Sequence, residues 1–296
     1  MPYTPTSRAE RGFSLIEMMV ATAIMSLALA LAGNFFVASR NGLLDELARE
    51  ETLQGLRATL DTLERDLRLG GACLPTTGND FPPLAGTNHG TLDGVTTRTA
   101  LVRSDLTCIQ STVAATSPAT GTTAGATTIP VQSVNGFAVG QRAYVRGSTN
   151  SGEYFNIAGV NTATNQLQIA AGLQSAYLNG SGVWAVDERA YAIDSTTYAP
   201  VTVLTIAANG TAPVPFAYGI QTVNVQYELA SDCPPCDVVD LPSTTQWPLV
   251  NQLYLTVTMQ SLKPLSYGQY FTATDTIGVK PRNLLPGTSV LGTPPA

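Results

Sequence analysis

The chain has 296 residues, enough for one large domain or two smaller ones with hydrophobic cores. Charged residues make up 12% of it, against roughly 25% in average soluble proteins, and the net charge is −6. With no long basic run, the sequence argues against nucleic acid as a partner. Abundant Gly, Ala, Thr, Ser and Asn in place of charges are typical of a β-rich protein outside the cytoplasm.

The most apolar part of the chain lies near its N-terminus. The segment from Phe13 to Ala38 has 26 residues and contains one charged side chain, that of Glu17. About 20 helical residues are enough to cross the hydrocarbon core of a membrane. Arg8 and Arg11 precede the segment, and this positive flank predicts that the N-terminus stays in the cytoplasm while the rest is exported. We therefore expect a transmembrane helix at 13–38.

Two conventional interpretations of this segment leave a feature unexplained. A cleaved secretory signal peptide fits the A-x-A-like sites at 28–30 and 30–32, but such peptides avoid charge, and the apolar run continues to Val37. An ordinary membrane anchor explains the length of the segment. It does not explain Glu17, whose carboxylate costs about 2.5–3.5 kcal/mol near the bilayer centre and less near an interface.

A third interpretation supplies a partner for Glu17. If the chain is cut between Gly12 and Phe13, a new α-amino group appears on Phe13, one helical turn before Glu17. An ammonium at a helix N-terminus opposes the macrodipole and is stabilised by a nearby acid. Glu17 could neutralise the amine of its own chain or that of a neighbouring copy, which would set how far one helix slides past another.

The stretch "RGFSLIE" and the apolar run after it resemble the prepilin N-terminal motif of type IV pilins and type II secretion pseudopilins. In that family a prepilin peptidase cuts after the glycine and methylates the new N-terminal residue. The resemblance implies a leader peptide at 1–12, cleavage after Gly12, an N-methylated Phe13 and an assembly role for Glu17.

The helix is predicted to continue beyond the membrane. No proline occurs between Phe13 and Leu74, so nothing forces the helix to stop. An amphipathic stretch at 39–70 has leucines at alternating spacings of three and four, and Gly70-Gly71 is a stop signal. We expect this leucine face to join the core of the head; it consists of Leu53, Leu56, Leu60, Leu63 and Leu67.

The remainder is predicted to be a β-rich periplasmic head over 71–285. Within it, 75–100 is expected to be loop-like and 112–127 to be a surface linker. Short strands separated by Asn- and Gly-rich turns predict a compact β insert at about 126–185. The Pro- and Gly-rich end, 286–296, is expected to be a flexible tail.

The last third of the head has the clearest strand pattern. Apolar residues alternate with polar ones in "GIQTVNVQYEL" and "NQLYLTVTMQSL", which puts one face of each strand on a core. The natural partner of that face is the leucine face of the N-terminal helix. The predicted fold class is therefore α+β, with a long N-terminal helix packed on an antiparallel sheet and a small extra β insert.

Head segments sharpen the resemblance. "LERDLRLGGAC", "ERAYAID", "GIQTVNVQYEL" and "VKPRNLL" are similar to the PilW family of minor pilins, and the C-terminal portion also resembles the J-type minor pseudopilin of type II secretion. PilW membership implies storage in the inner membrane and then a place in a pilus tip or priming complex. The implied partners are other minor pilins, the major pilin, the inner-membrane assembly platform and a PilY1-like tip adhesin. The alternatives are a J-type pseudopilin, or a secreted binding domain with a conventional signal peptide.

Four cysteines predict two disulfides in an exported chain. Cys233 and Cys236 form a CxxC in a loop and are expected to pair with each other, with Cys73–Cys108 as the second bridge. A zinc site is the weaker alternative, because the spacing is irregular and His89 is the only histidine. Asp232, Asp237 and Asp240 favour a solvated acidic loop over a calcium site. No G-x-S-x-G elbow or other catalytic constellation is present, so neither an enzyme nor a cofactor is predicted.

Overall fold

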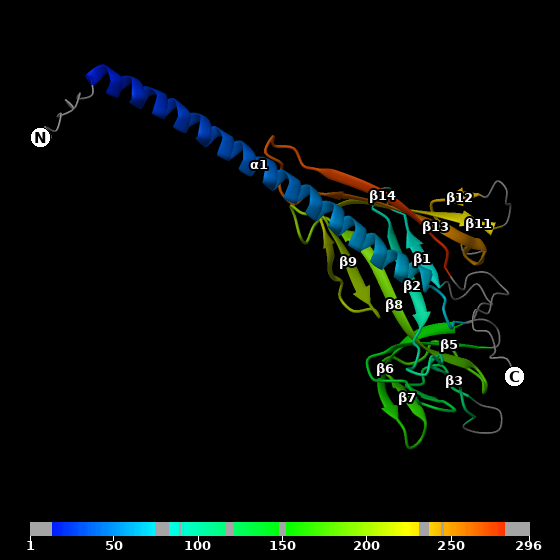
Figure 1. Cartoon of the computed structure of the whole chain (residues 1–296). Coiled ribbons are helices and arrows are strands. Elements are labelled where there is room, and N and C mark those ends of the chain that lie inside the picture. The colour runs from blue at the N-terminus through cyan, green and yellow to red at the C-terminus, as the bar shows by residue number, and fades with distance from the viewer. Residues whose placement is uncertain are drawn as a thin grey trace, which may run out of the picture.

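A long helix dominates the molecule (Figure 1). The computed structural model describes residues 14–74, 83–88, 90, 92–115, 121–147, 152–230, 237–243 and 246–281. Helix α1 (Leu15–Arg68) has 54 residues, which corresponds to about 81 Å. Its N-terminal half projects away from the rest of the chain, and its C-terminal half lies against the β-rich head. The sequence prediction of one uninterrupted helix from the apolar segment into the head is confirmed.

Both ends of α1 carry the expected local signals. Ser14 is the N-cap, and its backbone N–H donates a hydrogen bond to the Glu17 carboxylate at 3.0 Å. At the other end, Leu69 donates its N–H to the Arg65 carbonyl, and Gly71 takes a φ of +80°, which glycine adopts without strain. These groups satisfy part of the unpaired backbone at the helix termini.

A large antiparallel sheet forms most of the head. Its main path runs β1-β2-β8-β5-β6-β7-β4, with β3 and β9 also paired to β8 and β10 paired to β9. The strands are β1 (Leu84–Thr87), β2 (Gly94–Ala100), β3 (Gln110–Thr112), β4 (Thr128–Pro130), β5 (Arg142–Arg146), β6 (Gly152–Asn161), β7 (Gln166–Ile169), β8 (Gly182–Asp194), β9 (Val203–Ala208) and β10 (Val214–Tyr218).

A second, smaller antiparallel sheet has the order β12-β11-β13-β14. Its strands are β11 (Ile220–Leu229), β12 (Val238–Val239), β13 (Val250–Gln260) and β14 (Thr272–Val279), and the short 3-10 helix η2 (Trp247–Leu249) leads into β13. Helix α1 packs along β13 and β14. Asp93 links the two sheets, because its N–H donates to the Val223 carbonyl and its carboxylate accepts from the Val225 N–H at 3.0 Å.

The main core lies between α1 and the second sheet, as predicted. Leu56, Leu60, Leu63 and Leu67 are at most 3% exposed and pack among the inward side chains of β11 and β13. The inward set is the predicted one: Val223, Val225, Tyr227, Leu229, Leu253, Leu255, Val257 and Met259. Leu53, at the start of the predicted stripe, stays 38% exposed, so the buried leucines begin at Leu56, after Thr52, which is 5% exposed.

A second core occupies the predicted insert. It is built from apolar side chains between Ile109 and Ala185, so it begins before residue 126. Its strands are not a separate sheet, because β8 runs from this core into the layer beside α1. In Figure 1 the lobe made by β3, β5, β6 and β7 extends beyond the C-terminal end of the helix.

Two loop predictions were wrong. Residues 84–87 and 94–100 form β1 and β2, although 75–100 was expected to be loop-like. Thr97 of β2 is buried and donates its hydroxyl to the Asp66 carbonyl, so small polar side chains form a buried strand without hydrophobic alternation. In the expected linker 112–127, Val113 and Thr122 are buried and bridge to Val131 and Tyr177. The leader 1–12 and the tail 286–296 lie outside the described residues.

Candidate assembly and processing site

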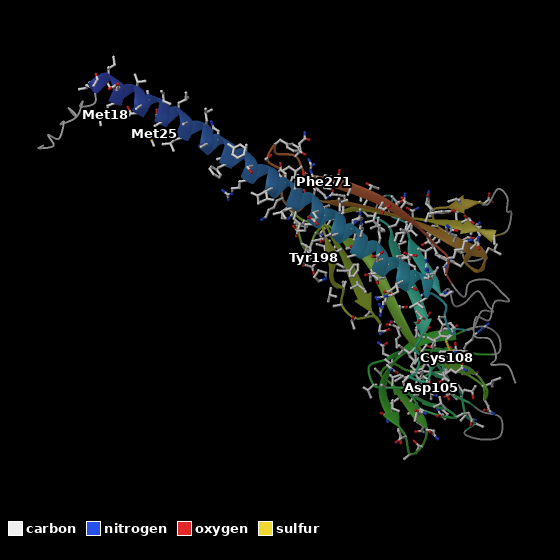
Figure 2. The ribbon with its side chains drawn as sticks, in the orientation of Figure 1. Met18, Met25, Asp105, Cys108, Tyr198 and Phe271 are labelled. Atoms are coloured by element: carbon white, nitrogen blue, oxygen red, sulfur yellow. A yellow bond between two sulfur atoms is a disulfide. The ribbon has the colours of Figure 1, made fainter. Side chains whose placement is uncertain are left out.

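The N-terminal half of α1 has no covering within the described chain. Every residue from Leu15 to Leu44 is exposed, a stretch of about 45 Å. Figure 2 shows its side chains, Met18 and Met25 among them, projecting from the helix away from the head. Among the described residues, α1 is the helix with the length and composition to cross a membrane, and none of its most apolar window is buried.

Glu17 lies in the first turn of this bare segment. Its carboxylate accepts the Ser14 N–H at 3.0 Å, and no ion pair of Glu17 occurs within the described residues. An acid in the first turn also interacts favourably with the helix dipole. A carboxylate has about four acceptor positions, so a cap on Ser14 leaves room for an ammonium.

The predicted cleavage residues Gly12 and Phe13 lie outside the described residues. The structure does fix where the helix starts relative to them, because Ser14 is the N-cap and Leu15 is the first helical residue. In a chain cut after Gly12, the new α-amino group would belong to Phe13, which directly precedes the N-cap Ser14 in sequence. That group would then stand beside the positive end of the helix dipole, where an acid such as Glu17 stabilises it.

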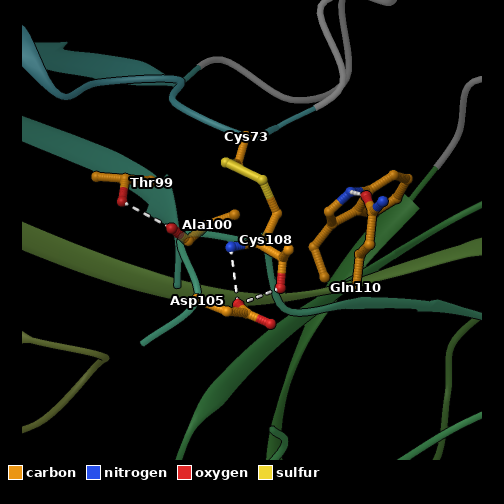
Figure 3. The surroundings of a disulfide bond; sticks show 8 residues. Cys73, Thr99, Ala100, Asp105, Cys108 and Gln110 are labelled. Atoms are coloured by element: carbon orange, nitrogen blue, oxygen red, sulfur yellow. Dashed lines mark hydrogen bonds between the residues drawn. A yellow bond between two sulfur atoms is a disulfide. The ribbon is translucent and has the colours of Figure 1, made fainter. Parts of the chain in front are cut away.

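The C-terminal end of α1 is tied to the head by a disulfide. Cys73 and Cys108 are bonded, with Cα atoms 5.9 Å apart and a sequence separation of 35 (Figure 3). Beside the bridge, the Ala100 N–H donates to the Ala72 carbonyl. The hairpin that carries Cys108 is held by Asp105, which accepts the backbone and hydroxyl hydrogens of Thr107. These hydrogen bonds lower the pKa of Asp105.

The disulfide therefore connects the helix end to the second core, whose first residue, Ile109, follows Cys108 directly. Cys233 and Cys236 of the predicted second bridge lie outside the described residues, as do His89 and Asp232.

Sequence reasoning missed the contacts where α1 enters the head. Ser266, in the loop between β13 and β14, donates both its N–H and its hydroxyl to the Asp45 carboxylate, at 2.8 and 2.6 Å. The Arg49 guanidinium lies 5.8 Å from the centre of the Phe271 ring. The run "SYGQYF" could have indicated a contact site in this loop, because its three aromatic residues do not follow the apolar–polar alternation of a strand.

Comparisons with known proteins agree with the geometry at the N-terminus. Residues 7–33 match the family model described as a prokaryotic N-terminal methylation motif. The chain is 32% identical over 94 residues to "Pilin-like protein PilA3" of Thermus thermophilus, an alignment that covers 29% of this chain and 40% of that protein. The chain thus spans less than half the length of this curated relative.

The matched motif contains Glu17 and most of the bare apolar segment, so motif and exposed helix coincide. The long N-terminal helix packed on antiparallel sheets, the methylation motif and the similarity to a pilin-like protein together support a type IV pilin-like protein.

Proposed function

We propose that this chain is a minor pilin of a type IV pilus. The apolar half of α1 holds the precursor in the inner membrane with its head in the periplasm. A prepilin peptidase then cuts after Gly12 and methylates Phe13, and the assembly platform builds the mature chain into the fibre. One observation carries the proposal: an acid, Glu17, stands in the first turn of a fully exposed apolar helix, inside a methylation motif.

The exposed apolar half of α1 needs an apolar surface around it both in the membrane and in a fibre. In the bilayer its apolar side chains lie in hydrocarbon. In an extracellular fibre no lipid is present, and about 45 Å of exposed apolar helix would face water unless neighbouring helices covered it. Burial of Glu17 among such helices is costly unless a cation meets it. The methylated amine of a neighbouring Phe13 is such a cation.

The minor role rests on the shape of the head. The lobe around the second core extends beyond the helix-packed core, and β8 and the Cys73–Cys108 bridge fix it there. Such bulk at every position of a shaft would crowd the packing of neighbouring heads. At the tip, the lobe is free to meet other minor pilins or a PilY1-like adhesin. We therefore place the subunit in a tip or priming complex, at low copy number.

The test is recovery of the chain in sheared fibres. We expect wild-type protein there to begin at methylated Phe13 by mass spectrometry, and to be much less abundant than the shaft subunit. Glu17→Ala should be cleaved normally but recovered about tenfold less or worse, the factor that about 1.4 kcal/mol produces. Glu46→Ala is the matched control, because Glu46 is an exposed acid of the same helix beyond the apolar segment.

Gly12→Leu serves as the processing control, since it should leave a full-length precursor in the membrane. Wild-type recovery of Glu17→Ala would contradict the assembly role of Glu17. A fibre subunit that still carries residues 1–12 would contradict the processing, and an abundance equal to that of the shaft subunit would contradict the minor role.

A further inference from the structure

The loop between β13 and β14, residues 261–271, is the part of the head that reaches farthest back along α1 toward its N-terminal half (Figure 1). It is a closed hairpin. The Ser261 N–H donates to the Phe271 carbonyl at 2.8 Å, and the Leu265 N–H donates to the Gln269 carbonyl at the same distance. Gly268 provides the left-handed turn at φ +81°. The shape of the loop is thus fixed by its own backbone.

Two contacts attach this loop to α1. Both oxygens of Asp45 accept hydrogen bonds from Ser266, and Arg49, one turn further on, lies over the Phe271 ring. A hydrogen bond with Tyr267 raises the pKa of Arg49. Because α1 is continuous from the apolar segment through these residues, the helix also fixes the height of the loop above the membrane.

That height places the attachment point just outside the lipid headgroup layer, toward which the loop extends. The apolar segment ends at Ala38, and Arg40 is the first charge after it. Asp45 stands seven residues beyond Ala38, about 10 Å along the helix axis. The interfacial layer on each side of the hydrocarbon core is roughly 5–7 Å thick. A loop held at Asp45 and directed toward the N-terminal half of α1 therefore lies at the membrane surface.

The exposed side chains of the loop suit that environment. Leu262 is 52%, Tyr267 59% and Tyr270 49% exposed, and Lys263 stands among them. Tyrosine is enriched at the membrane–water interface because its ring is apolar and its hydroxyl polar. A lysine extends its apolar stem along such a surface and keeps its ammonium in the headgroups. On the neighbouring turns of α1, Leu43 and Leu47 are also exposed.

We propose that residues 261–271 form a seat on the periplasmic headgroup layer of the bilayer, which holds the head against the membrane before assembly. The inference rests on the membrane anchoring proposed above. A lipid surface is favoured over a neighbouring subunit because the helix that carries the loop also crosses the membrane. Incorporation into a fibre then requires release of this seat as well as withdrawal of the helix.

The test uses the full-length chain in nanodiscs of phosphatidylethanolamine and phosphatidylglycerol. The photo-crosslinker benzoylphenylalanine replaces Tyr267 or Tyr270, and lipid adducts are quantified by mass spectrometry. Leu178 is the control, because it is similarly exposed, at 59%, and lies beside Tyr177 of the second core, in the lobe beyond the C-terminal end of α1. Leu31, within the apolar segment, is the positive control. We expect adduct yields at Tyr267 and Tyr270 several-fold above that at Leu178.

Yields at Tyr267 and Tyr270 equal to that at Leu178, with a strong signal at Leu31, would overturn the seat and leave the anchoring intact. Crosslinks from the loop to a second copy of the chain, in place of lipid, would also overturn it. Loss of the Leu31 signal would instead refute the membrane anchoring and the seat together. Thermal unfolding of each variant confirms that the head is folded.

Discussion

Both halves of α1 carry leucine side chains, but these lie in different environments. From Leu15 to Leu44 every residue is exposed, and Leu29 is 65% exposed. From Leu56 to Leu67 the leucines are buried at 0–3%. The apolar side chains of the helix therefore indicate that something covers them, but their pattern alone does not identify the covering surface. The upper half has its partner in the second sheet, whereas the partner of the lower half lies outside the chain.

The change between the two halves is abrupt and is marked by polar contacts. Between Arg40 and Glu51 charged residues alternate along the helix, and Asp45 and Arg49 hold the loop at 261–271. If the proposed function holds, a substitution N-terminal to this zone is expected to affect insertion and assembly, and one C-terminal to it is expected to affect folding of the head. The predictions that follow test this separation.

The largest expected effect comes from a matched pair of leucine truncations. Leu63→Ala removes a side chain that is 1% exposed in the main core and should lower the free energy of unfolding by about 2–5 kcal/mol. Leu29→Ala removes the same atoms from the bare half and should change head stability by less than about 0.5 kcal/mol. Urea unfolding of the full chain in detergent micelles measures both. Trp247, whose ring lies 5.1 Å from that of Tyr227, reports on the core.

Equal destabilisation by the two truncations would show that the lower half also folds against the head. A loss below about 1 kcal/mol for Leu63→Ala would show that the leucine face does not hold the helix on the sheet.

A somewhat smaller effect is expected at the upper end of α1. Cys73→Ser with Cys108→Ser opens a loop closed over 35 positions, which should cost about 2–4 kcal/mol. Since the bridge joins the helix end to the hairpin before the second core, the loss should appear mainly as earlier unfolding of that lobe. Hydrogen exchange resolved along the chain measures this. Ser104→Ala with Ser175→Ala, at two exposed serines, is the control for polar surface changes in the same region. Uniform loss across the head would contradict a local clamp.

The sequence predicted the contacts that arise from strong periodicity. The leucine stripe at 56–67 and the alternating strands β11 and β13 were recognised because each has one apolar face, and they meet as expected. Glu17 was found because a single acid interrupts an apolar run. In each case the signal is local in the sequence, and only one partner with the right face is available.

The features that were missed depend on contacts distant in sequence. β2, "GVTTRTA", has no apolar alternation, and Thr97 is buried only because Asp66 of α1 offers it a carbonyl. Likewise, nothing near Asp45 in the sequence indicates Ser266, which lies 221 positions away. The second core starts at Ile109 because β3, which follows this residue, pairs with β8, as β5 also does. No local sequence pattern indicates that β3 pairs with β8.

The smallest expected effect lies at the boundary between the two halves and depends on pH. The hydrogen bonds from the Ser266 hydroxyl and N–H lower the pKa of Asp45 below its ordinary value of 3.8. A group whose pKa is lower in the folded state stabilises that state above the ordinary pKa, and this contribution is lost as pH falls through the folded value. The attachment of the loop to α1 should therefore be complete at neutral pH and weaken below about pH 3.8.

Amide hydrogen exchange of Ser266, corrected for its intrinsic pH dependence, measures this attachment. Ser243 is the matched control, because its N–H donates to the Gln246 side-chain amide, which does not titrate. Protection of Ser266 should fall with acid while that of Ser243 stays constant, and Asp45→Asn should remove the difference. Parallel pH profiles for the two amides would show that Asp45 does not hold the loop, and the boundary would then rest on Arg49 and Phe271.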